Sequence, residues 1–293
     1  MSSTRSILTA EAPAPKRRRP GSQRRLASVH ITLIVGAVFM VFPFVWELLT
    51  AFKTFGGSTQ VPPQIIPDPW AWNFPDAFAR INVGQMTINS VIITVACTLG
   101  QIVLCTMAGY GFARIPFRGR NALFMAFLAV LMVPGQLFLV PQFEIIGKLG
   151  LLDSLPGVIL PGLFSAFGVF LMRQFFMSMP AELEEAARLD GANVWQIFRR
   201  VMLPLAKPGI IALAVFGALG NWNNLLWPLI ILNTSNKFPL SVGISALSQD
   251  VHNSTNYPQL LSVALVAMLP MLITFIVLQR QFIAGIAFSG GKG

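Results

Sequence analysis

Six stretches of this chain contain no Asp, Glu, Lys or Arg, and each approaches or exceeds the length of a membrane span. A hydrocarbon layer about 30 Å thick needs roughly 20 apolar helical residues to cross it. Only 11% of the residues are charged, against about 25% in soluble proteins, which argues against a water-soluble domain. We therefore predict an all-α, polytopic membrane protein with six transmembrane helices, at residues 28–50, 86–110, 121–142, 155–177, 205–230 and 259–281. Prolines inside these spans predict kinks and do not argue against spanning.

The cationic side chains predict how the spans are oriented, because Lys and Arg are retained on the cytoplasmic side. With the N-terminus inside, 17 of the 21 Lys and Arg residues lie on the cytoplasmic side. The four on the other side are Lys53, Arg80, Lys148 and Lys237. Both termini are therefore expected to be cytoplasmic. The net charge of +10 is accounted for by topology, and no nucleic-acid partner is expected.

The N-terminal segment differs in composition from the rest of the chain. Residues 1–27 are predicted to be a flexible basic cytoplasmic tail, ahead of a membrane domain at 28–293. The following apolar run is too long for a signal peptide, and no small-residue cleavage site follows it. The basic run Lys16–Arg19 either anchors the topology or touches anionic lipid.

The most polar stretch outside the tail is residues 179–208. Its pattern predicts two short helices joined at Gly191, which can adopt a left-handed conformation. Pro180 is expected in the first turn of the first helix, with three glutamates following at the positive end of the helix dipole. Pro204 and Pro208 are expected to end the second helix. A lipid-facing amphipathic segment would normally have a basic polar face, so a segment with small residues flanked by carboxylates is more typical of docking on another protein.

Three motifs in this stretch resemble a known family. Glu185-Ala186-Ala187, Asp190-Gly191-Ala192 and Leu203-Pro204 have the order and spacing of the EAA loop of binding-protein-dependent ABC importer permeases. Over residues 30–293 the chain resembles the maltose-type carbohydrate importers, and specifically their second permease subunit. The resemblance implies that the loop 179–208 sits in a cleft of a cytoplasmic ATPase. The residues that it assigns to this coupling are Glu184, Glu185, Ala186, Ala187, Asp190, Gly191, Ala192, Leu203 and Pro204.

The same resemblance implies the rest of an assembly in the bacterial inner membrane. The chain would form half of the translocation pathway for a sugar or oligosaccharide. Its partners would be a homologous second permease subunit, two copies of the ATPase, an extracytoplasmic solute-binding protein and membrane lipid. The chain contains no Gly-x-x-x-x-Gly-Lys-Ser/Thr loop, so ATP and Mg²⁺ are expected on the ATPase. We expect no cofactor or metal in this chain and no enzymatic activity of its own.

Polar and aromatic residues within the apolar spans are candidates for lining that pathway. Side-chain amides can hydrogen-bond sugars, and aromatic faces can pack on sugar rings. Polar groups inside a membrane usually face an aqueous path or the interior of the helix bundle. The alternative is that the Asn residues only bond neighbouring helices and that the Trp residues lie at the membrane interface. The candidates are Asn221, Trp222, Asn223, Asn224 and Trp227, with Gln136 and Gln142 in the third span.

Three other functions remain as alternatives. The first is the same type of permease for a glycerophosphodiester or a polyol. The second is a self-contained secondary transporter, which would need ionisable residues or interrupted half-helices within its spans. The third is a membrane-embedded enzyme, for which the sequence supplies no nucleophile, metal cluster or acid–base pair.

Overall fold

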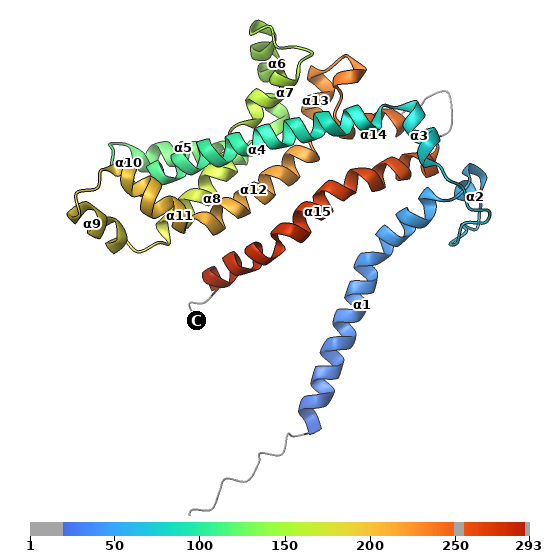
Figure 1. Cartoon of the computed structure of the whole chain (residues 1–293), viewed down its shortest axis with the longest axis horizontal. Helices are drawn as coiled ribbons and strands as arrows, with labels where there is room; N and C mark the ends of the chain where they lie inside the picture. Colours follow the sequence, from blue (N-terminus) through green and yellow to red (C-terminus); the bar gives the residue numbers. More distant parts are fainter. Residues whose placement is uncertain (1–19, 249–254, 291–293) are drawn as a thin grey trace, which may run out of the picture. The chain divides into compact units, whose positions relative to one another are not determined.

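The computed structural model describes residues 20–248 and 255–290, and the side chains of residues 28–248 and 255–277. Every regular element in these ranges is helical, as the sequence predicts. The chain divides into two compact units, Met1–Glu47 and Leu48–Gly293. The elements (Figure 1) are α1 (Pro20–Ala51), α2 (Phe55–Thr59), α3 (Phe74–Arg80), α4 (Val83–Arg114), α5 (Arg120–Met132), η1 (Gly135–Phe138), α6 (Leu139–Lys148), α7 (Leu155–Gly162), α8 (Ala166–Met177), α9 (Glu182–Leu189), α10 (Val194–Ile197), η2 (Phe198–Met202), α11 (Leu203–Leu205), α12 (Lys207–Trp222), α13 (Leu226–Ile231), η3 (Ser235–Lys237), α14 (Leu240–Ser248) and α15 (Tyr257–Gly290).

Helix α1 begins earlier than the first predicted span. It starts at Pro20, a residue that suits the first turn of a helix, so the described part of the expected tail, residues 20–27, is helical. The rest of the expected tail, residues 1–19, lies outside the described residues. The stretch Ser28–Ala51 is long and apolar enough to cross a membrane. Pro43 lies inside this helix without ending it, as expected for a proline in a membrane span.

Helix α4 is the centre of the second unit. It packs along α8 and α12, and α12 in turn packs against α15 (Figure 1). Glycine at two positions allows α4 and α8 to approach closely. A Cβ on Gly109 would lie 2.6 Å from Met172 Cβ, and a Cβ on Gly168 would lie 2.9 Å from Cys105 Sγ. Small residues at such crossings are typical of helix packing in membranes.

The fourth predicted span is interrupted between α7 and α8, and α4 supplies the hydrogen bonds that the interruption requires. Gln101 Nε2 donates to the carbonyl of Gly162 at 2.8 Å, and Cys97 Sγ donates to the carbonyl of Ile159 at 3.6 Å. Freed carbonyls must find protein partners inside a bilayer, since no water is present there. The two helices together, Leu155–Met177, still qualify as one candidate span.

Four segments are long and apolar enough to cross a membrane, and two bent helix pairs bring the number to as many as six among the described residues. The third predicted span is wrong as a continuous helix over residues 121–142. Helix α5 ends at Met132, and the chain turns by 99° before continuing through η1 and α6. Pro134 lacks the N–H that would continue α5, and Gly135 follows it directly.

The fifth predicted span also differs from a single helix over residues 205–230. Helix α12 ends at Trp222, and α13 begins only at Leu226. At its other end, α12 follows the short helices α10 to α11 at an angle of 73°. Pro208 lies in the first turn of α12, where its missing N–H costs no helical hydrogen bond.

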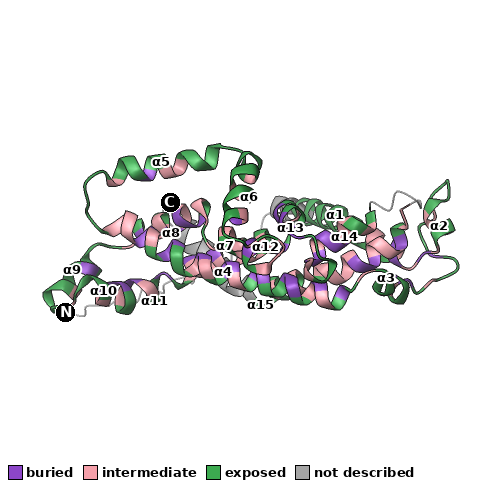
Figure 2. Ribbon diagram, turned by 90° about the horizontal axis from the view of Figure 1, so that it is seen from above, coloured by how far each residue is buried: buried purple, intermediate pink, exposed green. Residues whose placement is uncertain are grey.

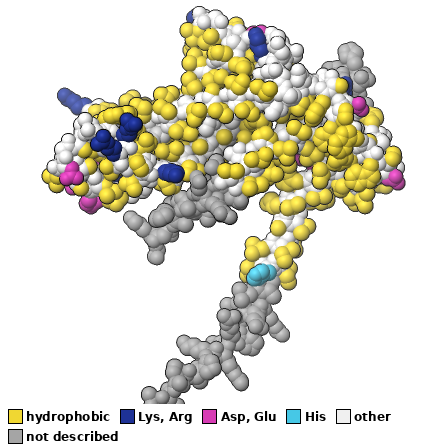
Figure 3. Space-filling view, in the orientation of Figure 1, with side chains coloured by type: hydrophobic (Ala, Val, Ile, Leu, Met, Phe, Trp, Pro, Cys, Tyr) yellow, Lys and Arg dark blue, Asp and Glu magenta, His cyan; other side chains and the backbone are white. Residues whose placement is uncertain are grey.

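The helices differ in how far they are buried and in the side chains that they expose. Most of α5 is exposed, and Phe124 is its buried residue (Figure 2). Hydrophobic side chains cover most of the face shown in Figure 3. Charged side chains lie at the end that carries α9 and α10, and others lie over α6 and at the end that carries α2 and α3.

Candidate functional site: the segment α9 to α11

The segment 179–208 forms two short helical arms on either side of Gly191, as the sequence predicts. Two details differ. Pro180 precedes α9 and its N-cap Ala181, so it does not lie in the first helical turn. Pro204 does not end the second arm but lies at the start of α11, and the chain remains helical to Leu205.

The second arm contains a π-helical turn, η2, that the sequence analysis did not predict. In this turn the N–H of Leu203 bonds the carbonyl of Phe198, five residues earlier. Pro204 follows immediately, and its ring cannot sit against the carbonyl four residues before it in a regular α-helix. The wider turn relieves that conflict, and such turns are frequent at functional sites.

Gly191 ends α9 in a complete Schellman motif. Its φ of +81° is left-handed, and its N–H donates to the carbonyl of Arg188 at 3.0 Å. The N–H of Ala192 donates to the carbonyl of Ala187, also at 3.0 Å. These are the two hydrogen bonds that define the motif. A Cβ at Gly191 would meet nothing within 4 Å, so its backbone conformation alone demands glycine.

Helix α9 turns one acidic side chain inward. Glu184 is 5% exposed, and its Oε1 lies 3.5 Å from Nε of Arg114 at the end of α4. Its Oε2 lies 3.6 Å from Arg188, one turn further along α9. Ala187 also faces inward and packs, together with Ala192, against the buried cluster that contains Phe198. The sequence analysis placed Glu184 among the coupling residues but did not identify its pairing with Arg114.

The opposite face of α9 is exposed. Glu185, Ala186 and Asp190 lie on it, and Leu189 is 90% exposed. The sequence analysis missed Leu189, although its spacing from Glu185 and Ala186 is the i, i+3, i+4 of one helix face. Leu189 is thus an apolar side chain exposed between Glu185 and Asp190 on this face.

The second arm is held on the core of the chain. Ile197, Phe198 and Met202 are buried with Tyr110 and Phe176 from α4 and α8. Leu203 packs against the same cluster, whereas Pro204 is exposed. Of the coupling residues expected from sequence, Glu184, Ala187, Ala192 and Leu203 therefore contact this chain itself. Those left on the surface are Glu185, Ala186, Asp190, Gly191 and Pro204.

The candidate pathway residues are separated into two groups. Asn221, Asn224, Trp227 and Gln142 line one cavity of about 150 Å³, together with Cys97 and Gly162 of the α4–α7 crossing. The remaining three do not line it. Trp222 donates to the carbonyl of Ala267 on α15 at 3.0 Å, Asn223 donates to the carbonyl of Leu219 on its own helix at 2.9 Å, and Gln136 is exposed in η1.

Interhelical hydrogen bonds, the alternative considered for these side chains, are present even within the cavity group. Trp227 Nε1 donates to the carbonyl of Gly157 at 3.3 Å, and Asn221 Nδ2 donates to Thr98 Oγ1 at 3.5 Å. Trp227 is buried, so it does not lie in an exposed interfacial position within this chain. Among the residues whose side chains are described, the amides of Gln142 and Asn224 form no hydrogen bond, so these two polar groups of the cavity are open to a ligand.

Asp153 joins the loop before α7 to the loop after α13. It accepts hydrogen bonds from the N–H groups of Asn233 and Thr234 at 2.9 and 3.0 Å and from the Thr234 hydroxyl, and its Oδ2 lies 2.9 Å from Lys237 Nζ. These donors, the Thr234 hydroxyl first and the Lys237 ammonium next, hold the pKa of the Asp153 carboxyl well below its usual range. The sequence analysis did not identify this cluster.

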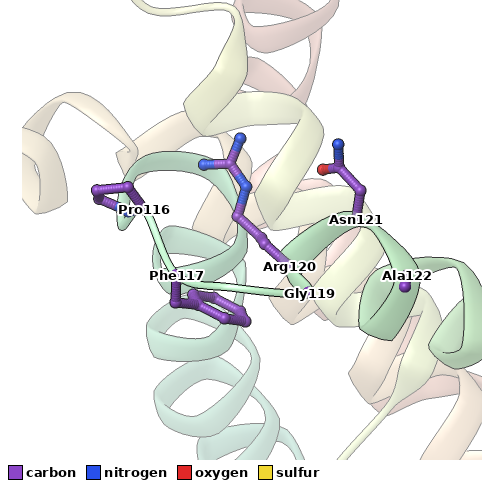
Figure 4. A pocket seen from close by; sticks show the side chains of 6 residues that line it. All are labelled: Pro116, Phe117, Gly119, Arg120, Asn121 and Ala122. Carbon is purple, nitrogen blue, oxygen red and sulfur yellow. The ribbon is translucent and has the colours of Figure 1, made fainter.

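A basic hollow of about 330 Å³ lies in the loop between α4 and α5. Figure 4 shows the Arg120 and Asn121 side chains extending to the same side of this loop, with Phe117 below them. Arg118 and Arg120 form no ion pair with the part of the chain whose side chains are described. The hollow contains none of the site residues expected from sequence.

Comparison with known proteins identifies a family. Residues 101–287 match the model of the family described as binding-protein-dependent transport system inner membrane component. The arabinooligosaccharides transport system permease protein AraQ of Bacillus subtilis is 35% identical over 88% of this chain and 92% of its own length. The diacetylchitobiose uptake system permease protein NgcG of Streptomyces coelicolor is 36% identical over 92% and 90%.

Another similar protein carries a different substrate name. The sn-glycerol-3-phosphate transport system permease protein UgpE of Pectobacterium atrosepticum is 33% identical over 89% of this chain and 95% of its own length. Among solved structures, one chain of a bacterial ABC transporter that imports alginate matches with a TM-score of 0.75 at 24% identity, covering 92% of this chain and all of that one. This likeness shows that the two chains share a fold.

Proposed function

Because this chain belongs to the family of binding-protein-dependent transport system inner membrane components, we propose that it is one of two permease subunits of an ABC importer for a sugar or oligosaccharide. The second permease subunit is a homologue, two copies of a cytoplasmic ATPase supply the energy, and an extracytoplasmic binding protein delivers the solute. The names of AraQ and NgcG favour an oligosaccharide. A glycerophosphate or related solute, as for UgpE, is the second candidate.

The proposed topology has six spans with both termini in the cytoplasm of a bacterial cell. One span is then the bent pair Arg120–Met132 with Gly135–Lys148. Another lies in the second bent pair, whose Lys207–Trp222 half crosses the membrane while its Val194–Leu205 half stays on the cytoplasmic side. Helix α5, with 13 residues, is only about 20 Å long at 1.5 Å per residue, which is shorter than the hydrocarbon core of about 30 Å. The distribution of Lys and Arg supports this orientation, which places α9 inside and the Asp153 cluster outside.

The observation that carries the coupling role is the exposed face of α9. In the proposed complex this face enters a cleft of the ATPase, where Glu185 pairs with a cation and Ala186 permits close approach. Leu189, at 90% exposure, supplies the apolar contact that is lost when the complex dissociates. Ala187 and Ala192 act differently, since their small side chains let α9 and its turn pack against this chain's own core.

The coupling role is tested by co-purifying the full chain with its partner subunits. Replacing Leu189 by Ser, or Glu185 by Gln, is expected to weaken retention of the ATPase and to abolish transport. Glu144→Gln, an exposed acid in α6 far along the chain from α9, is the matched control and is expected to retain the ATPase. Full ATPase retention and transport in Leu189→Ser would refute docking through this face.

The substrate class is tested on the assembled transporter in proteoliposomes, and by calorimetric binding to its binding protein. Arabinooligosaccharides and diacetylchitobiose are the first solutes to compare, with sn-glycerol 3-phosphate as the alternative. Saturable binding and ATP-dependent uptake of an oligosaccharide would support the proposal. Uptake of glycerol 3-phosphate with no response to any oligosaccharide would instead establish the second candidate.

A further inference from the structure

Arg114, the last residue of α4, makes contacts with the segment α9 to α11 and the turn before it that the proposed docking does not explain. Its side chain is 13% exposed and lies where three elements meet. The guanidinium donates to the carbonyl of Phe176 from Nε at 3.2 Å and from an Nη at 2.6 Å, and the same Nη donates to the carbonyl of Met179. These acceptors lie at the C-terminal end of α8 and in the turn that follows it.

The same guanidinium holds Glu184 of α9. Glu184 Oε1 forms no hydrogen bond with the described residues, and Nε of Arg114 lies 3.5 Å from it. The connection from α8 to α9 thus wraps around a single cation. A cation is favourable at the C-terminal end of α8, and an anion is favourable in the first turn of α9, so both helix dipoles support the arrangement.

The main packing neighbours of α9 are α10 and η2 in the second arm. Ala187 of α9 also packs against the buried cluster that contains Tyr110 of α4 and Phe176 of α8. Arg188, the remaining partner of Glu184, belongs to α9 itself and is largely exposed. The Arg114–Glu184 ion pair is therefore the polar contact that joins α9 to the ends of α4 and α8.

We propose that the Arg114–Glu184 pair is the link that makes α9 move together with α4 and α8, so that a displacement of α9 by the ATPase is passed to the membrane-crossing helices. This inference rests on the proposed coupling function. Both are positioning residues: neither contacts solute or nucleotide. The link depends on a guanidinium that donates hydrogen bonds to two carbonyls while its charge pairs with one carboxylate, an arrangement that the single ammonium of lysine does not reproduce.

The test uses the assembled transporter and four variants: Glu184→Gln, Glu184→Asp, Arg114→Lys and the double variant Arg114→Gln/Glu184→Gln. Transported sugar per ATP hydrolysed is measured together with ATPase retention. Glu184→Gln is expected to retain the ATPase and to hydrolyse ATP while sugar moved per ATP falls by roughly tenfold or more, as for the loss of one partner of a buried pair. Glu184→Asp, which keeps the charge, is expected to recover part of this ratio, and Arg114→Lys to fall between the wild type and Glu184→Gln.

The double variant tests whether Arg114 and Glu184 act as one linked pair or independently. If the two side chains act as one unit, removing both is no worse than removing one. Multiplied losses in the double variant, or an unchanged ratio of sugar to ATP in Glu184→Gln, would overturn the proposal. Glu144→Gln serves as the control with the same chemical change at an exposed site.

A second measurement does not depend on the ATPase. Hydrogen exchange of the full chain in lipid nanodiscs is expected to show faster exchange of the α9 amides in Glu184→Gln and Arg114→Lys, with the amides in the middle of α4 unchanged. Unchanged exchange in α9 would overturn the link. If the wild-type chain fails to bind any ATPase, the coupling function is wrong, while the exchange experiment still decides whether Arg114 holds α9.

Discussion

The left-handed conformation of Gly191 leads to a prediction that depends on backbone geometry and not on side-chain size. Its φ is +81°, and no atom lies within 4 Å of the position that a Cβ would take. A substitution there should therefore damage coupling in proportion to the strain that the new residue suffers in this conformation. We expect sugar uptake to decrease in the order wild type, Gly191→Asn, Gly191→Ala and Gly191→Val.

The magnitudes follow from the cost of the left-handed region. A residue with a Cβ pays roughly 1–2 kcal/mol there, which lowers the ratio of this turn to its alternatives by about 5- to 30-fold. Asparagine pays less, because its side chain can hydrogen-bond locally. Valine pays more than alanine, since β-branched residues are genuine outliers at positive φ. As the left-handed turn becomes less populated, both hydrogen bonds of the Schellman motif are expected to form less often.

The assay is sugar uptake per ATP in proteoliposomes that hold the assembled transporter, with membrane insertion checked by the yield of folded chain. Gly119 provides a matched control, because it also has φ +81° and no atom within 4 Å of a Cβ, but lies in the α4–α5 loop. Gly119→Ala should insert and retain the wild-type ratio of sugar to ATP. The reasoning fails if Gly191→Asn is as damaging as Gly191→Val, or if Gly191→Ala has no effect.

Three further predictions concern other parts of the chain. The pKa of Asp153 is depressed, so its bonds to Lys237 and the loop stabilise the fold at any pH above the unfolded carboxyl pKa of about 3.9. This stabilisation is lost as the pH falls through the lower pKa of the folded state. In thermal unfolding, Asp153→Asn should be less stable than the wild type at pH 7, and the difference in stability should narrow only in strong acid. Gly168→Ala should lower the free energy of unfolding by roughly 1–3 kcal/mol, because its Cβ would lie 2.9 Å from Cys105 Sγ. Gly111→Ala is the control and should leave the free energy of unfolding unchanged, because there is open space around Gly111. If the cavity lies on the solute path, Asn221→Leu should raise KM for sugar without lowering basal ATP hydrolysis, and an unchanged KM would remove the cavity from the path.

The helical fold and its approximate spans could be predicted because a charge-free length is a property of the linear sequence. The breaks within spans could not. Pro43 and Pro270 lie inside continuous helices, whereas Pro134 marks a 99° bend. The residue type is the same, but Pro134 lies between the end of α5 and the start of η1, whereas Pro43 and Pro270 have helix on both sides. Whether a proline kinks or breaks a helix therefore depends on its neighbours and on the packing available to each half.

The candidate site shows the same division between local and distant causes. The end of α9 at Gly191 follows from one residue and was predicted correctly. The pairing of Glu184 with Arg114 joins segments far apart in the sequence, and no local pattern reveals it. Likewise, Asn221 and Gln142 line one cavity because α12 and α6 both reach the α4–α7 crossing, where Cys97 and Gly162 also line it.

Glu184 and Glu185 show why position on a helix matters more here than residue type. Successive residues of an α-helix point about 100° apart, so one carboxylate faces the core of the chain and the other faces solvent. The inward carboxylate is already neutralised by Arg114, so it has little charge to offer to a partner. The outward one has no ion pair with the described side chains and retains its charge for a cation on the ATPase. The two Glu→Gln substitutions should therefore fail differently: loss of Glu185 releases the ATPase, whereas loss of Glu184 leaves the ATPase bound and active but disconnected from the membrane helices.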